Sequence, residues 1–334
     1  MGCEPPTEED MTRTLRTLIL AAFAAEAFAS GALAQQYPTG PIRLIVTFAP
    51  GGSSDVLARS VAKAMSEGLK QQVVVENRPG AGGNIGAMAV ARGEADGYTA
   101  LFGTNGTLAI GPALYKSLQY DPVRELAPVG MLHRLPNVLV IHPSIPATNL
   151  RELIAYARLK PGELTFASAG VGSASHLAGE LLKAAANIDI LHVPYKGGGA
   201  AMPDLLSGRV SMMIETIPNA LPSARAGTLR ALGVTTPARS AAAPDLPTLA
   251  EAGLPGFDVS SWTGLFVPAG TPRAIIERLN AETLRIARDS GYIEQIKTLG
   301  TDVVSSTPEA LGEYMVKDIA NWSTAVQRSG ARAE

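Results

Sequence analysis

The hydrophobic positions near the start of the chain change from one period to another. An apolar run, Ile42–Phe48, is typical of a buried strand. After a stretch of small residues, apolar side chains recur at every fourth position, as expected for one face of a helix: Leu57, Val61, Met65 and Leu69. The pattern therefore predicts a strand, a Gly-rich turn over Ala49–Asp55, and a helix that begins near Ser54.

The same strand, turn and helix pattern recurs through the rest of the chain. Further strands are predicted at Gln72–Glu76, Thr99–Gly103, Asn137–His142, Leu164–Ala167, Ile190–Pro194, Ser211–Thr216, Leu229–Thr235 and Val259–Val267. These runs are almost continuously apolar, which suits parallel strands covered by helices on both faces. We therefore predict an α/β protein whose sheets are mainly parallel and flanked by helices.

Two features suggest a division into lobes. A proline-rich segment, 121–136, interrupts the pattern before the strand at Asn137, and Asn137–Pro143 is similar to Thr263–Pro268. Paired strands of this kind suit two crossings of the chain between two lobes. We expect one lobe from residues 37–136 plus 236–334, another from 137–235, and a ligand cleft between them.

The N-terminus has the pattern of an export signal. A basic stretch with Arg13 and Arg16 precedes an apolar run, and Ala32-Leu33-Ala34 resembles a cleavage site. We expect residues 1–34 to be a signal peptide, with Met11 as the possible true start, and the mature chain to be periplasmic. A cytosolic amphipathic helix is the alternative. Cleavage would also remove Cys3, the only cysteine, so no disulfide is expected.

Composition excludes several functions. The chain has 334 residues, 5% aromatic residues and a formal net charge of −2, with no basic stripe. Nucleic-acid binding is therefore not expected. No later run approaches the roughly 18 apolar residues of a membrane span. We expect a soluble mature protein, most simply a monomer.

Motifs for catalysis, cofactors and metals are missing from the sequence. It contains no GxxxxGK[ST], no G-x-S-x-G, no H-E-x-x-H and no G-x-G-x-x-G. The four histidines lack metal-ligand spacing. A Ser–His–Asp site assembled in space stays open, but we expect no enzyme, no cofactor and no metal.

Four turns of small residues remain, and each follows a predicted strand. They are Ala49–Asp55, Gly103–Thr107, Ala169–His176 and Tyr195–Gly199. Ligands of open α/β sheets bind outside the carboxyl ends of strands. Glycine and serine turns at helix starts offer backbone N–H groups and hydroxyls to an anion. The turns therefore indicate a carboxylate site with one nearby cation, Lys196.

Each candidate also has a structural interpretation. Gly51 and Gly52 suit any tight turn, and Asp55 suits the N-terminal end of a helix dipole better than contact with an anionic ligand. His176 also suits packing or capping, Lys196 suits a solvated turn, and Glu215 suits either the lining of the cleft or a hinge ion pair. Trp262 is more typical of a core residue than of a ligand contact.

Longer segments carry a family resemblance. FAPGGSSDVLAR, VVVENRPGAGGNIG, LTFASAGVGSASHLAGELL and HVPYKGGGAAMPDLLSGRV, in this order, resemble the periplasmic solute-binding proteins of tripartite tricarboxylate transporters, also called Bug receptors. The resemblance covers about residues 37–330. It implies a type II periplasmic-binding fold, in which two lobes close on a carboxylate, and transient contact with integral membrane transporter subunits.

The resemblance also implies which residues hold the ligand. In the family, the turn after the first strand and the AGxGSxxH turn clamp a carboxylate. Together with the turns described above, this gives the candidate ligand residues Ala49, Pro50, Gly51, Gly52, Ser53, Asp55, Thr104, Ala169, Gly170, Gly172, Ser173, His176, Tyr195, Lys196 and Glu215. The family often has Asp at Glu215, Pro at Ala200 and an aromatic residue at Thr263. These departures leave the identity of the acid open.

Three functions are compatible with these features. The first is a receptor that captures a small organic carboxylate and delivers it to a membrane permease. The second is a binding protein that presents the acid to a sensor. The third is an exported enzyme on the same scaffold.

Overall fold

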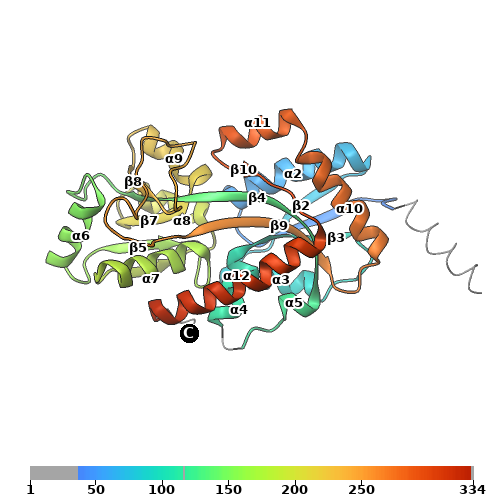
Figure 1. The fold of residues 1–334 in the computed structure, drawn as a ribbon, viewed down its shortest axis with the longest axis horizontal. Coiled ribbons are helices and arrows are strands. Elements are labelled where there is room, and N and C mark those ends of the chain that lie inside the picture. Colours follow the sequence, from blue (N-terminus) through green and yellow to red (C-terminus); the bar gives the residue numbers. More distant parts are fainter. Residues whose placement is uncertain (1–36, 116, 332–334) are drawn as a thin grey trace, which may run out of the picture.

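The computed structural model describes residues 37–115 and 117–331, so the predicted signal peptide lies outside the described part of the chain. The fold is a two-lobed mixture of helices and strands (Figure 1). The strands are β1 (Ile42–Val46), β2 (Val73–Asn77), β3 (Thr99–Thr104), β4 (Leu126–Ile141), β5 (Thr165–Ser168), β6 (Leu191–Pro194), β7 (Met212–Thr216), β8 (Arg230–Val234), β9 (Ser260–Pro268) and β10 (Asp302–Val303).

The helices alternate with the strands, as the sequence pattern predicted. They are α2 (Ser53–Leu69), η1 (Ala81–Gly83), α3 (Asn84–Ala91), η2 (Gly106–Ile110), α4 (Gly111–Leu114), α5 (Pro122–Glu125), α6 (Leu150–Leu159), α7 (Ala174–Ala186), α8 (Gly198–Leu206), α9 (Ile217–Arg225), α10 (Arg273–Ile286), α11 (Ser290–Thr298) and α12 (Pro308–Ser329). Within the described residues, no helix combines the length and the apolar character needed to cross a bilayer.

The strands follow the order β2-β1-β3-β9-β4-β7-β5-β6, with β8 and β10 paired to β4. Pairing is parallel among β1, β2 and β3 and among β5, β6 and β7. The long strands β4 and β9 run antiparallel to their neighbours and connect these two parallel groups. β4 pairs with β9 over Leu126–Pro136 and with β7 over Asn137–Ile141, so it passes from the group of β1 to β3 to the group of β5 to β7.

The extent of β4 differs from the expectation. The proline-rich segment was predicted to separate two elements, yet β4 already begins at Leu126 and runs for 16 residues. The strand tolerates Pro128 because its pairing with β9 shifts register between Pro128 and Gly130. Proline has no N–H for a ladder bond, and such an irregularity removes the need for one. Composition alone therefore hid most of this strand, residues 126–136.

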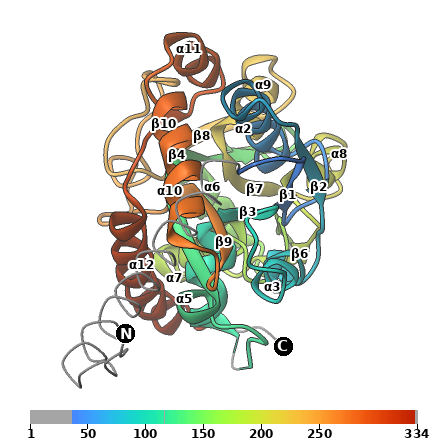
Figure 2. The ribbon, with the colours of Figure 1, turned by 90° about the vertical axis from the view of Figure 1, so that its right-hand side faces the viewer.

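Helices cover both faces of each lobe. In the first lobe, one apolar core packs α2, α10 and α11 against the sheet, and α3, η2 and α12 belong to the core on the other face. In the second lobe, α8 and α9 share one core and α6 and α7 share the other. In both Figures 1 and 2, α2, α9 and α11 lie above the central strands, and α3 and α12 lie below them. Both faces of the central strands are thus buried, which explains their continuous apolar runs.

The exact division of the chain between the lobes stays a prediction. One segment assigned to the first lobe, 236–259, makes backbone bonds to the second. The N–H of Val234 donates to Pro247 O (2.9 Å), and the N–H of Leu249 donates to Val234 O (2.8 Å). These bonds keep the segment beside β8, and we propose that the second crossing begins near Val259.

Candidate functional site

The turn after β1 opens one side of the site. The helix α2 starts at Ser53, and its N-cap residue Gly52 makes no side-chain capping bond. Gly51 has φ +87°, a backbone conformation that glycine adopts without strain. The first N–H groups of α2 therefore meet no capping side chain, and Ser53 and Ser54 line a cavity in front of them.

Asp55 belongs to the support of this turn. Its carboxylate accepts hydrogen bonds from the N–H of Gly51 (3.1 Å), from Arg59 (3.1 Å) and from Asn77 (3.0 Å). Burial alone raises the pKa of Asp55, but these donors outweigh it and hold the pKa below its usual value. The carboxylate is occupied at the base of the turn, and Asp55 is not among the residues that line the cavity.

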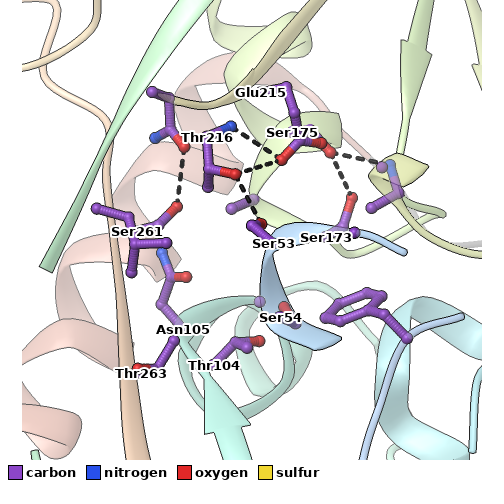
Figure 3. Close-up of a pocket in the computed structure, with 18 of the residues that line it drawn as sticks. Ser53, Ser54, Thr104, Asn105, Ser173, Ser175, Glu215, Thr216, Ser261 and Thr263 are labelled. Carbon is purple, nitrogen blue, oxygen red and sulfur yellow. Dashed lines mark hydrogen bonds between the residues drawn. The ribbon is translucent and has the colours of Figure 1, made fainter. Parts of the chain in front are cut away.

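The turn after β5 forms the opposite side and is held by its own side chains. The Oγ of Ser173 accepts a bond from the N–H of His176 (3.3 Å), which caps α7. The Oγ of Ser175 accepts a bond from the N–H of Ala169 (2.9 Å) and lies 3.2 Å from the Oγ of Ser173. Figure 3 shows Ser173 and Ser175 on the cavity side of this turn.

Two more helices begin at the cavity. The N-caps of α8 and α9 are Gly197 and Thr216, and neither makes a side-chain capping bond. Gly198 and Thr216 both line the cavity. The hydroxyl of Thr216 lies 2.7 Å from the Oγ of Ser53, on the opposite lobe. Four helix starts, those of α2, α7, α8 and α9, thus surround one space, and each carries partial positive charge.

The cavity has a volume of about 60 Å³, and almost all of the polar side chains in its lining are uncharged. Hydroxyl and amide groups dominate its polar lining, as Figure 3 shows. Among the residues that the structure describes, no Lys, Arg or His lines the cavity, and Glu215 is the one lining residue with an ionisable side chain. Any anion in this space must therefore be held by neutral donors and helix dipoles rather than by a cation.

The two lobes are in contact across the cavity. The N–H of Ala49 donates to Lys196 O (3.0 Å), and the hydroxyl of Tyr115 donates to Val171 O (2.8 Å). Glycines make this approach possible, because a Cβ added to Gly199 would lie 2.7 Å from Gly52 N. The structure therefore has the lobes closed over the cavity.

The histidines near the site are packed. His176 is buried and stacks on His192 with ring centroids 4.2 Å apart. Burial, with the His192 ring as a second cause, lowers the pKa of His176 to about 3. His192 Nε2 lies 2.6 Å from Ser168 Oγ, but neither residue lines the cavity. This Ser–His pair faces no ligand space, and both rings are neutral at physiological pH.

The structure brings about half of the predicted residues to the cavity. Those that line it are Ala49, Gly52, Ser53, Thr104, Ala169, Ser173 and Glu215. Those that do not line it are Pro50, Gly51, Asp55, Gly170, Gly172, His176, Tyr195 and Lys196. Most of the second group shape the turns; Tyr195 instead donates to Asp204 (2.7 Å), and the Lys196 side chain is exposed.

Other lining residues were not named as candidates. Ser54, Asn105 and Ser175 lie within the predicted turns, whereas Asn137, Thr216 and Ser261 lie outside them. Asn137 bridges the two crossing segments, because its amide donates to Val259 O (2.9 Å) and its Oδ1 accepts from Ser261 (3.1 Å). The available signal was a polar residue at the start of an apolar predicted strand. Trp262 is both a core residue and a cavity residue. It is buried and donates to Asp318 (2.7 Å), and it also lines the cavity.

The fold and the closed cavity define a two-lobed solute-binding protein. The chain belongs to the family described as the tripartite tricarboxylate transporter family receptor, whose model matches residues 57–331. This confirms the resemblance found in the sequence.

Close relatives support the same assignment. The chain is 39% identical to BugT of Bordetella pertussis over 325 residues, which cover 97% of this chain and 99% of BugT. Among solved structures, R. palustris Rpa4515 with adipate has a TM-score of 0.87 at 36% identity, covering 89% of this chain and 99% of that one. MatC from Rhodopseudomonas palustris with bound malate has a TM-score of 0.84 at 35% identity, covering 87% and 100%.

Proposed function

We propose that the protein is a periplasmic receptor that captures a small organic carboxylate and delivers it to the integral membrane subunits of a tripartite tricarboxylate-type transporter. One observation carries the proposal: four helix N-termini meet at a closed cavity whose lining has no basic side chain. Helix starts attract anions through their free N–H groups and their dipoles. A carboxylate is the anion that such a neutral cradle holds without reacting with it.

The donors suffice for useful affinity. A hydrogen bond to a charged group contributes roughly 1.5–3 kcal/mol, and three or four of them, less ordering costs, reach about micromolar affinity. Ser53, Ser54 and Ser173 line the cavity, and we propose that they supply such bonds from both lobes. The structural relatives with adipate and with malate support a carboxylate as the ligand class.

The surroundings favour binding over turnover. The Ser168–His192 pair lies outside the cavity lining, and burial lowers the pKa of His192 to about 4, so it is a poor proton acceptor at neutral pH. The cavity itself offers hydroxyls without a neighbouring base that touches them, apart from Glu215. We therefore propose that the acid leaves the protein unchanged.

Closure of the lobes supplies the signal for delivery. The contacts between Ala49 and Lys196 and between Ser53 and Thr216 exist only when the lobes meet. A transporter subunit that contacts both lobes would then distinguish the loaded from the empty receptor. We propose that the receptor acts as a monomer with one cavity.

A screen of carboxylates tests this function. A ligand that binds only the folded protein raises its melting temperature, and calorimetry then gives the affinity. We expect at least one small carboxylate to bind at about micromolar affinity and to be recovered unchanged after long incubation. If amides and alcohols of the same skeletons stabilise the protein as well as the acids do, the carboxylate assignment is wrong.

A further inference from the structure

One end of the cavity differs from the rest. Glu215 is 7% exposed, lines the cavity and is its one acidic side chain. Its Oε1 accepts bonds from the N–H of Thr216 (2.8 Å) and from the Thr216 hydroxyl (2.8 Å). Its Oε2 has no hydrogen-bond partner of its own among the described residues. A buried carboxylate oxygen in this position is a hydrogen-bond acceptor that awaits a donor.

No cation compensates Glu215 within the described chain. Burial raises the pKa of the Glu215 carboxyl, the Thr216 donors oppose this, and no basic residue contributes. Lys196, the basic residue of the neighbouring turn, is exposed and is not part of the lining. A second carboxylate brought to this end would meet a buried acid with nothing to separate the two charges.

Gly198 makes room for the Glu215 carboxylate. A Cβ at Gly198 would overlap Glu215 Oε2 and lie 2.8 Å from the Nδ2 of Asn219. The missing side chain at the start of α8 therefore lets the Glu215 carboxylate pack against this helix, and both residues line the cavity. The cavity thus combines the donors of the helix starts with one carboxylate acceptor.

We propose that Glu215 is the specificity-determining residue of the site, and that it selects a monocarboxylate that carries a hydrogen-bond donor, an ammonium or hydroxyl group, in place of a second carboxylate. The inference rests on the proposed function, because it assumes that the ligand carboxylate is held by the helix starts. The donor completes Glu215 Oε2, and an ammonium group also neutralises the acid. A dicarboxylate at the same position must either take up a proton or be repelled by Glu215, and either cost weakens its binding.

A matched panel of acids tests the selection. Each set shares a skeleton and differs only in the group opposite the carboxylate. One set is butyrate, 4-hydroxybutyrate, 4-aminobutyrate and succinate, with corresponding three-, five- and six-carbon sets. A ring set is benzoate, 4-hydroxybenzoate, 4-(aminomethyl)benzoate and terephthalate. Calorimetry at neutral pH gives the affinities. We expect a donor-bearing acid to bind at least about tenfold more tightly than the methyl- or carboxylate-ended members of its set.

Glu215→Gln separates a role in selection from a role in structure. Its amide keeps the shape but donates to a carboxylate, so the preference within a set should fall by about tenfold and move toward the dicarboxylate. Glu215→Asp keeps the charge and should keep the order of preference. Glu313→Gln, an exposed position on α12, is the matched control and should change nothing.

The outcomes distinguish the role of Glu215 from the carboxylate-receptor function on which it rests. If a dicarboxylate binds the wild type as tightly as its donor-bearing partner, or if Glu215→Gln weakens every acid equally, the role of Glu215 is overturned and the carboxylate receptor stands. If no acid of any set binds the wild type, the proposed function fails and the selection fails with it. If Glu215→Gln does not fold, the order of preference in Glu215→Asp and in the wild type decides.

Discussion

The two turns that face each other across the cavity are built in opposite ways. The turn before α2 has a glycine N-cap, and its nearest acid, Asp55, bonds back to Gly51. The turn before α7 satisfies its own backbone, because Ser173 bonds the N–H of His176 and Ser175 bonds the N–H of Ala169. The first turn therefore leaves N–H donors for a ligand, whereas the second presents hydroxyls from a rigid frame. Similar glycine and serine content conceals different roles.

Among changes to these two turns, blocking the contact between the lobes should reduce ligand affinity the most. In Gly199→Ala, the new Cβ would lie 2.7 Å from Gly52 N, which belongs to the backbone of the other lobe. Overpacking costs about 1–3 kcal/mol, and opening of the lobes relieves it, so we expect ligand affinity to fall about 5- to 150-fold. The melting temperature without ligand should change little.

The measurement is calorimetry with an acid found by the screen. Gly40→Ala is the control, because its Cβ would meet only Tyr98, at 4.0 Å. Unchanged affinity in Gly199→Ala would show that the closed contact at Gly52 is not needed for binding.

Removing the hydroxyl of Ser173, in the second turn, should cause the next largest loss of ligand affinity. Ser173→Ala removes a cavity donor and the cap of α7. We expect affinity to fall by about 1–2 kcal/mol, the value of one hydrogen bond, and stability to fall by about 0.5–2 kcal/mol. Denaturant titration and calorimetry measure the two losses. Thr307→Ala removes the cap of α12, away from the cavity, and should reduce stability alone; equal losses of affinity in both variants would remove Ser173 from the site.

The acid of the first turn should affect stability rather than binding. The pKa of Asp55 is held below its usual value, so its ionised form stabilises the folded state above the unfolded pKa. That contribution is lost as the pH falls through the folded pKa. Asp55→Asn should therefore lower stability by about 1–3 kcal/mol at neutral pH, and the difference should shrink in strong acid.

Denaturant titrations across this pH range give the comparison for Asp55→Asn. Ligand affinity should stay within about threefold of the wild type, a change smaller than one hydrogen bond. A difference in stability that is independent of pH would contradict the role given to the carboxylate.

The smallest effect is expected at Lys196. Its carbonyl accepts the bond from Ala49, but its side chain is exposed. Lys196→Gln retains the backbone bond and loses only a screened charge, so affinity should change by less than about 1 kcal/mol. A larger loss that vanishes at high salt would place the ammonium group at the ligand after all.

These contrasts show how much of the site could be predicted. Small residues after apolar strands predicted four turns that each contribute residues to the cavity lining, because the carboxyl ends of strands meet there. Sequence could not say which side chains of a turn face inward. Lys196 and Tyr195 follow the same strand as Gly198, yet only Gly198 reaches the cavity. Such directions depend on the opposite lobe.

The strands that join the lobes were the part of the fold that was hardest to predict from the sequence. The α/β class followed from the apolar periods, and most predicted elements lie within a few residues of the observed ones. β4 was cut short because prolines usually end a strand, and its register shift at Pro128 cannot be read locally. Asn137 and Ser261 were missed for the same reason, since their pairing depends on how the crossing segments align.

The pairing of β3 with β9 has a consequence for how the chain acquires its structure. Leu101 pairs with Phe266, so the second lobe lies between the two partners in sequence. Contacts of such long separation form slowly, because the entropy of closing the loop must be lost before the contact forms. A chain shorter than residue 259 lacks β9 and cannot complete its first sheet. We therefore expect the first lobe to fold only after nearly the whole protein has been synthesised.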